Sequence, residues 1–253
     1  MTLSVNTTAN TTAVGSTTVA ATKPTGATTG DILVAWVSKN TVTAPSGVPS
    51  GWALIGAAGG LYHGGFTGGQ ATAANIGTGW GGWYFKEAGG SEPGTYTWTS
   101  TSATWDVTIY RMSGFAGQKP GGVVVTAFAW PAAKVNARAS TAITAAQISM
   151  CDASIADRYI ALYSITQTVA GVVTNFSALS GALTQDSYNA QTGISTLCAH
   201  ETIDMTSNPF IPQRGCTTDQ TAGSTGGYYL LMADPSSTGP QIDKRHIKRQ
   251  RAP

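Results

Sequence analysis

The sequence has few charged residues. Lysine, arginine, aspartate and glutamate make up 10% of its 253 residues, against roughly a quarter in an average soluble domain. Hydrophobic residues make up 42%, so threonine, serine, glycine, asparagine and glutamine must cover most of the surface. An uncharged surface of this composition is typical of strand-rich extracellular or virion proteins.

Long apolar runs and an export signal are also missing. No window comes near the roughly 18 apolar residues of a membrane-spanning helix, so we expect no membrane partner. The segment from Met1 to Thr8 has neither the basic nor the apolar region of a secretory signal peptide. We therefore expect synthesis in a host cytoplasm without a cleaved leader. An extracellular type of surface without such a leader fits a virion protein released by lysis.

Signatures of common enzymes are absent as well. The sequence contains no Gly-x-Ser-x-Gly elbow, His-Glu-x-x-His motif, phosphate-binding loop or dinucleotide fingerprint. Cys198 and His200 would share one face of a strand, but no ligand spacing accompanies them. A glycosidase needs two facing carboxylates, and the candidates exist in number only: Glu87, Glu92, Asp106 and Glu201. The sequence predicts a non-enzymatic protein with no catalytic residue, no metal and no cofactor.

Several of the carboxylates are better explained by a structural role in turns than by a role in catalysis. Glu87 and Glu92 flank a turn at residues 88–91. Asp31 and Asp157 each stand directly before an apolar run, where an aspartate side chain accepts hydrogen bonds from the backbone of a turn. We expect these residues to be structural.

The three cysteines, Cys151, Cys198 and Cys216, match no zinc or redox spacing. Cys198 and Cys216 would be able to pair if their strands adjoin. The simpler interpretation is that they are small buried thiols.

Apolar and polar residues alternate along most of the chain, and helical periodicity is nearly absent. This alternation predicts an all-β protein, an antiparallel β-sandwich of jelly-roll type. A weak helix candidate covers residues 132–137. Strands are expected at residues 32–37, 96–99, 105–110, 123–130, 142–149, 159–165, 196–203 and 228–232.

The pattern of motifs runs twice. Asp31 with the strand after it matches Asp157 with its strand, and Tyr110 to Met112 matches Leu230 to Met232. We expect one β-sandwich module at residues 1–117, a second at 118–235, and a linker with a basic arm at 236–253. The sequence leaves open whether the halves form two sandwiches or merge into one.

The segment 56–82 contains eleven glycines and scattered aromatic residues. A long glycine-rich loop is usually functional or mobile, so we expect Tyr62, Phe66 and Trp80 to anchor a partner. All seven tryptophans lie within the first 130 residues. Most are expected in the core, although flat aromatic faces also stack on sugars.

The C-terminal arm is the only densely charged part of the chain. Residues 1–240 carry nine basic and eleven acidic residues, whereas residues 241–253 carry five basic and one acidic. The arm is interpreted as a solvated tail, a nucleic-acid contact or a contact for an acidic protein surface. It has no aromatic residue for base stacking, which favours a protein partner over nucleic acid. The predicted binding residues are Lys244, Arg245, Lys248, Arg249 and Arg251.

Several motifs of the first half resemble those of a family of tailed-bacteriophage structural proteins. They are Gly30 to Ala35, Pro49 to Ile55, Trp83 to Lys86 and Ser91 to Trp98. The resemblance is clear over residues 16–114, weaker over 122–233, and does not reach the basic arm. It implies a β-sandwich on the virion exterior, of the minor tail, head-fibre or capsid-decoration type. These motifs mark strands and turns, so no functional residue is carried over.

The sequence therefore predicts a virion structural protein that binds and stabilises neighbouring capsid or tail subunits. We expect a homo-oligomer or another symmetric assembly. The alternative is a carbohydrate-binding module or adhesin that recognises a host-surface glycan through loop aromatics. Head or tail location, oligomeric state and host are not encoded in any motif.

Overall fold

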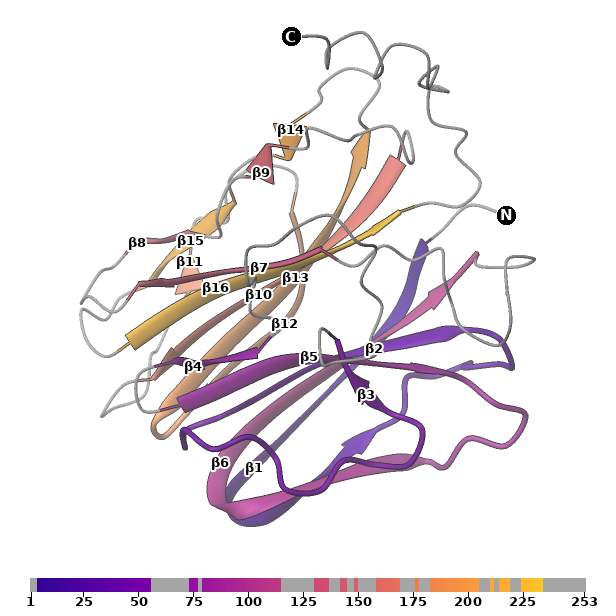
Figure 1. Cartoon of the computed structure of the whole chain (residues 1–253), viewed down its shortest axis with the longest axis horizontal. Helices are drawn as coiled ribbons and strands as arrows, with labels where there is room; N and C mark the ends of the chain where they lie inside the picture. The colour runs from indigo at the N-terminus through magenta and orange to yellow at the C-terminus, as the bar shows by residue number, and fades with distance from the viewer. Residues whose placement is uncertain are drawn as a thin grey trace, which may run out of the picture.

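The computed structural model is all-β (Figure 1). It describes residues 4–55, 73–76, 79–114, 130–136, 142–144, 148–149, 158–168, 176–177, 183–204, 210–211, 214–218 and 224–233. Within these ranges the regular elements are all strands, and their pairs are antiparallel. The described residues contain no helix able to cross a membrane. The predicted fold class, an antiparallel β-sandwich, is confirmed.

The first half of the chain forms a six-stranded sheet. Its order is β1 (Ser4–Thr22), β6 (Thr95–Ser113), β2 (Ile32–Lys39), β5 (Gly79–Glu87) and β3 (Ala53–Leu54), with β4 (Ala73–Ile76) also paired to β5. The pairing of β1 with β6 shifts register between Ala13 and Thr18. Gly15, between them, has a φ of 58°, which glycine adopts without strain. This bulge bends both strands, and their far ends fold back over the sheet (Figure 1).

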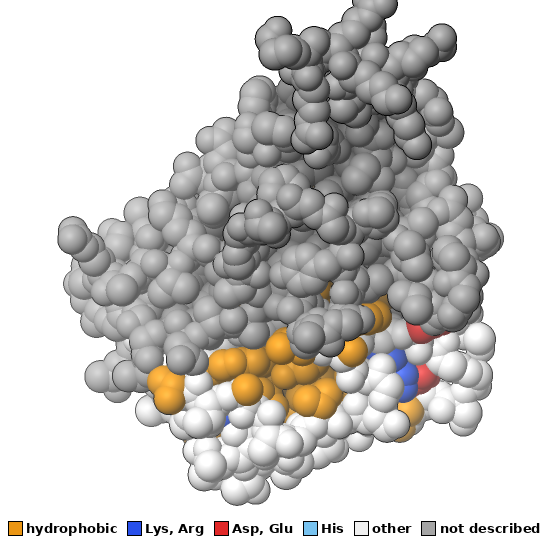
Figure 2. Space-filling view, viewed as in Figure 1, with side chains coloured by type: hydrophobic (Ala, Val, Ile, Leu, Met, Phe, Trp, Pro, Cys, Tyr) orange, Lys and Arg blue, Asp and Glu red, His pale blue; other side chains and the backbone are white. Residues whose placement is uncertain are grey.

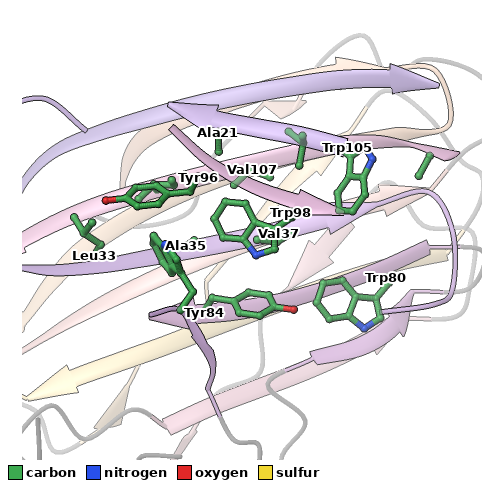
Figure 3. Close-up of a cluster of buried hydrophobic side chains, with 14 of the residues drawn as sticks. Ala21, Leu33, Ala35, Val37, Trp80, Tyr84, Tyr96, Trp98, Trp105 and Val107 are labelled. Atoms are coloured by element: carbon green, nitrogen blue, oxygen red, sulfur yellow. The ribbon is translucent and has the colours of Figure 1, made fainter. Parts of the chain in front are cut away.

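Strand β2 lies in the middle of this half and all its residues are buried. Successive side chains of a strand point to opposite faces. Leu33, Ala35 and Val37 therefore enter the first-half core, between the sheet and the folded-back ends of β1 and β6. This core is built from Val19, Ala21, Leu33, Ala35, Val37, Trp52, Trp80, Tyr84, Ala88, Tyr96, Trp98, Ala103, Trp105, Val107 and Ile109 (Figure 3). The strand predicted at residues 32–37 is confirmed as one covered on both faces.

The second half forms a five-stranded sheet with its own outer layer. The sheet order is β12 (Thr184–Gln191), β13 (Ile194–Asp204), β10 (Arg158–Thr168), β16 (Ser224–Ala233) and β7 (Trp130–Asn136). Short strands form two smaller sheets, β11 (Phe176–Ser177), β15 (Gly215–Thr218) and β8 (Ala142–Thr144), and β14 (Phe210–Ile211) with β9 (Ile148–Ser149). Ile165, Leu197 and Ala199 of the large sheet pack with Cys216 of β15. We call this cluster the second-half core.

The two large sheets have the same strand order. In each, the first strand pairs with the last and the last pairs with the second, so β1-β6-β2-β5 corresponds to β7-β16-β10-β13. Met112 lies opposite Ile32, and Met232 lies opposite Ile160. The repeated motifs thus mark two similarly connected sheets. The expected boundaries at residues 117 and 235 fall outside the described residues, so the division into modules stays a prediction.

The two sheets pack face to face through a third cluster, which we call the shared core. Equivalent strands present equivalent faces there, because β2 contributes Ile32 and Val34 while β10 contributes Ile160 and Leu162. The remaining buried members are Trp36, Ile55, Trp83, Tyr110, Met112 and Cys198. Each half therefore has a core of its own and shares another with its neighbour.

Three local predictions have a clear outcome. The weak helix candidate at residues 132–137 is wrong, because Trp130 to Asn136 form strand β7. Cys198 and Cys216 are buried free thiols, as the simpler interpretation expected. They do not pair, because Cys198 packs in the shared core and Cys216 in the second-half core, on opposite faces of the same sheet.

Candidate assembly surface

Among the residues predicted to bind a partner, the structure describes Trp80 alone. Trp80 lies on β5, is 5% exposed, and its ring centroid is 6.2 Å from that of Tyr84 (Figure 3). The expectation that Trp80 is an exposed anchor is wrong, because Gly79, Gly81 and Gly82 belong to a buried strand and not to a loop. The other predicted residues lie outside the described ranges: Tyr62, Phe66, Lys244, Arg245, Lys248, Arg249 and Arg251.

The described tryptophans are core residues, as most of them were expected to be. Trp36, Trp83, Trp98 and Trp105 have no exposed area, and Trp52 is 7% exposed. Their rings contact one another at angles that aromatic pairs prefer; for example, Trp52 and Trp98 lie edge to face at 5.3 Å. None of the tryptophan side chains that the structure describes offers a flat face to a sugar.

Asp31 and Glu92 stabilise turns in the first half. Asp31 accepts hydrogen bonds from the Thr28 N–H at 2.9 Å and from Arg111 Nε at 2.7 Å, so its predicted turn role is confirmed. Glu92 accepts from the Gly89 N–H at 2.6 Å and pairs with Lys86 at 2.9 Å. Burial alone would raise the pKa of each carboxyl, but these bonds outweigh it and hold the pKa below its ordinary value.

Glu201 has a similar structural role in the second half. Arg214 binds it through two nitrogens at 2.8 and 2.9 Å, and the Tyr163 hydroxyl donates to it at 2.6 Å. The side chains of Tyr163 and Glu201 are on the faces of their strands that point away from the shared core, whereas Asp106 faces the shared core. Glu201 and Asp106 therefore do not face each other across a cleft as glycosidase carboxylates would.

The described residues hold no cluster of histidine, cysteine and carboxylate side chains suited to a metal. His200 Nδ1 lies 2.8 Å from Asp186 Oδ1, while Cys198 is buried in the shared core. Burial raises the pKa of the Cys198 thiol, so this cysteine stays protonated and unreactive at neutral pH.

Strand β1 is a 19-residue edge strand. It ends the first sheet, and within the described part of the chain β6 is its one pairing partner. Its side chains from Ser4 to Thr22 include no charged residue and no proline. In the part of the described surface that Figure 2 shows, uncharged side chains predominate, and a few charged side chains lie at the right. An edge strand displays unpaired backbone N–H and C=O groups, which can bind a further strand.

The equivalent edge strand of the second half is different. Strand β7 ends its sheet, is 7 residues long against 19 for β1, and contains Pro131 and Lys134. Proline and lysine are the residues with which proteins protect edge strands from unwanted pairing. The first half lacks this protection at the corresponding strand. Its sequence signal is an uncharged stretch with the repeat Asn-Thr-Thr-Ala at residues 6–13, which contains none of the aromatic or basic residues that predicted a binding site.

Side-chain hydrogen bonds connect β1 to β6 and to the second half. Asn10 Nδ2 donates to Asp106 Oδ1 at 2.9 Å, and Asn189 Nδ2 of β12 donates to Asn10 Oδ1 at 2.6 Å. The bend at Gly15 leaves Val14 as the most exposed large hydrophobic residue described, at 62%. Strand β1 is thus a long polar edge held by side-chain hydrogen bonds at Asn10, and an edge that is already ordered loses little entropy on pairing.

Comparison with known proteins finds little that is similar. No family model matches the chain, and the search of curated proteins finds no match. Among solved structures the chain is similar to "Crystal Structure of the STIV MCP", a viral major capsid protein, with 11% sequence identity and a TM-score of 0.24. That alignment covers 92% of this chain and 96% of the other. At this TM-score we take neither fold nor function from the likeness.

Proposed function

We propose that the protein is a non-enzymatic structural protein of a phage virion. It would bind to the outside of the particle, as a capsid-decoration or minor tail protein, and stabilise neighbouring subunits. Strand β1 carries this proposal, because its 19 uncharged residues form a sheet edge without the protective proline and lysine found on β7. The resemblance of residues 16–114 to phage structural proteins supports the same assignment.

Pairing at this edge would suit a repeated assembly. Backbone hydrogen bonds from a neighbouring strand supply affinity, and the side chains of alternate residues supply specificity. Threonine-rich strands also form favourable cross-strand threonine pairs. The absence of charged residues on β1 removes like-charge repulsion between identical copies in a symmetric shell or tube.

The test uses purified particles that lack the protein and the full chain added back. The double variant Val14→Lys/Thr17→Lys places one charge on each side of the bend in β1 at exposed positions. We expect at least a tenfold loss of particle binding in cosedimentation, with an unchanged unfolding midpoint. The matched control Ser91→Lys adds a charge at an exposed turn of the same half and should bind like the wild type. Equal binding by the double variant would refute the role of β1.

The adhesin alternative has a separate readout. If the wild type binds host-surface glycans on an array and fails to bind particles, the virion assignment is wrong. The buried state of the described tryptophans gives the alternative no support from the first-half core.

A further inference from the structure

Asp106 is a buried carboxyl between the two halves. It lies on β6, is 1% exposed, and faces the second sheet. Its Oδ1 accepts a hydrogen bond from Asn10 at 2.9 Å. Its Oδ2 is buried and has no hydrogen-bond partner among the described residues.

No described cation compensates this carboxyl. Strand β1 presents Asn10, β2 presents Ser38, and β12 presents Ser187 and Asn189. The neighbouring Lys39 points to the other face, where its Nζ lies 5.4 Å from the Trp105 ring centroid.

Among the described residues, no titratable group on this side forms an ion pair with the Asp106 carboxyl. Burial raises the pKa of Cys198 and of Tyr110, so both are neutral near pH 7. His200 of β13 pairs with Asp186 of β12. On β10 the facing residues are Ser164 and Thr166, which carry no charge.

Hydrogen bonds between the halves surround Asp106. Ser38 and Thr196 hydroxyls lie 3.1 Å apart, and those of Thr108 and Ser187 lie 2.8 Å apart. Asn189 binds Asn10, the residue that also binds the Asp106 carboxyl. A charge on Asp106 would therefore appear at the contact between the two sheets, and not within one half.

An ionised carboxylate buried without a cation carries a large desolvation cost, which protonation removes. Burial accordingly raises the pKa of Asp106 to about 7, although the amides of Asn10 and Asn189 act to lower it.

We propose that Asp106 is a proton-controlled lock between the two halves of the chain. With the carboxyl protonated, the sheets pack closely through the shared core. When the proton leaves, the buried charge weakens the contact and favours separation of the sheets or entry of water. This inference does not depend on the virion assignment.

The sign of the pH effect follows from linkage. The unfolded chain releases the Asp106 proton near pH 4, its ordinary value, while the folded chain keeps it until about pH 7. Raising the pH through this window favours the unfolded state, which has already released the proton. The unfolding constant therefore rises by up to about tenfold per pH unit. Above that window the effect levels off.

The test measures urea unfolding of the full chain from pH 4.5 to 8.5, a span chosen to bracket that window. The isosteric variant Asp106→Asn should lose most of the decline in stability seen in the wild type. The control is His200→Gln, which removes the neighbouring ionisable pair with Asp186 but keeps the Asp106 carboxyl, and it should retain the decline. Hydrogen exchange should locate the loosening at residues 184–204 and at β1.

A direct measurement covers the case in which Asp106→Asn fails to fold. Carboxyl ¹³C NMR of the wild type should show one aspartate titrating about three pH units above the others. An Asp106 carboxyl that titrates near its ordinary value would overturn the proposal. So would an Asp106→Asn variant that folds and keeps the full decline.

Discussion

The two halves share a strand order but differ at their edges and in their cores. Strand β1 is a long edge strand without proline or charged residues, whereas its counterpart β7 is short and contains proline and lysine. The first-half core holds Trp52, Trp80, Trp98 and Trp105, whereas the described members of the second-half core are aliphatic residues and Cys216, with Tyr188 packed against them. Strand order therefore depends on the alternation and the turns, and not on which large residues fill the core. The differences leave the first half as the part suited to contact with neighbours.

The largest expected effect is on the cores. Trp98→Ala should lower the free energy of unfolding by about 3–5 kcal/mol, because Trp98 is fully buried among aromatic rings. Leu197→Ala in the second-half core should cost about 2–5 kcal/mol. Urea unfolding measures both, with Val48→Ala at an exposed position as the control.

The same pair of variants tests whether the halves unfold together. Because the shared core joins them, we expect one transition and loss of hydrogen-exchange protection in both sheets for either variant. If Leu197→Ala unfolds the second sheet while the first stays protected, the halves are independent folding units.

A smaller effect is expected for the ion pair of the second half. Glu201→Gln should cost roughly 1–3 kcal/mol, since it removes a charge from a buried contact with Arg214 and Tyr163. The side chain of Arg214 is 19% exposed, which keeps the cost below that of a fully buried pair. A double-mutant cycle with Arg214→Met isolates the coupling. Additive costs would show that the pair contributes no coupling energy.

Asp31 and Asp106 should respond to pH in opposite directions. The hydrogen bonds of Asp31 lower its pKa, so its contribution is present at neutral pH and is lost as the pH falls below about 4. Asp31→Asn should cost roughly 1–2 kcal/mol at pH 7 and flatten the acid limb of the stability profile. Urea midpoints from pH 2.5 to 7 measure this. An acid limb that is unchanged in Asp31→Asn would contradict it.

Alternation and turn chemistry made much of the fold predictable. The run at residues 32–37 and the role of Asp31 both follow from local physics. The glycines around Trp80 predict a loop, whereas β5 pairs with β2, β3 and β4, and its residues from Gly79 to Tyr84 are buried. Asp106 gave no local signal, because its environment comes from Asn10 and Asn189, which are far apart in sequence. The open edge of β1 depends likewise on which strands become neighbours.

The smallest expected effect on stability belongs to the basic arm, which lies outside the described residues and stays a prediction. Deleting residues 241–253 should leave the unfolding midpoint unchanged, because every strand and core residue that the structure describes precedes them. The arm carries five of the fourteen basic residues, so it would speed and orient docking on an acidic partner surface. Particle binding by the full chain should then weaken between low salt and about 0.5 M salt, where the Debye length falls to a few ångströms. Cosedimentation of both forms across that range measures the effect. Equal binding at every salt concentration would show that the arm is a solvated tail and that β1 acts without it.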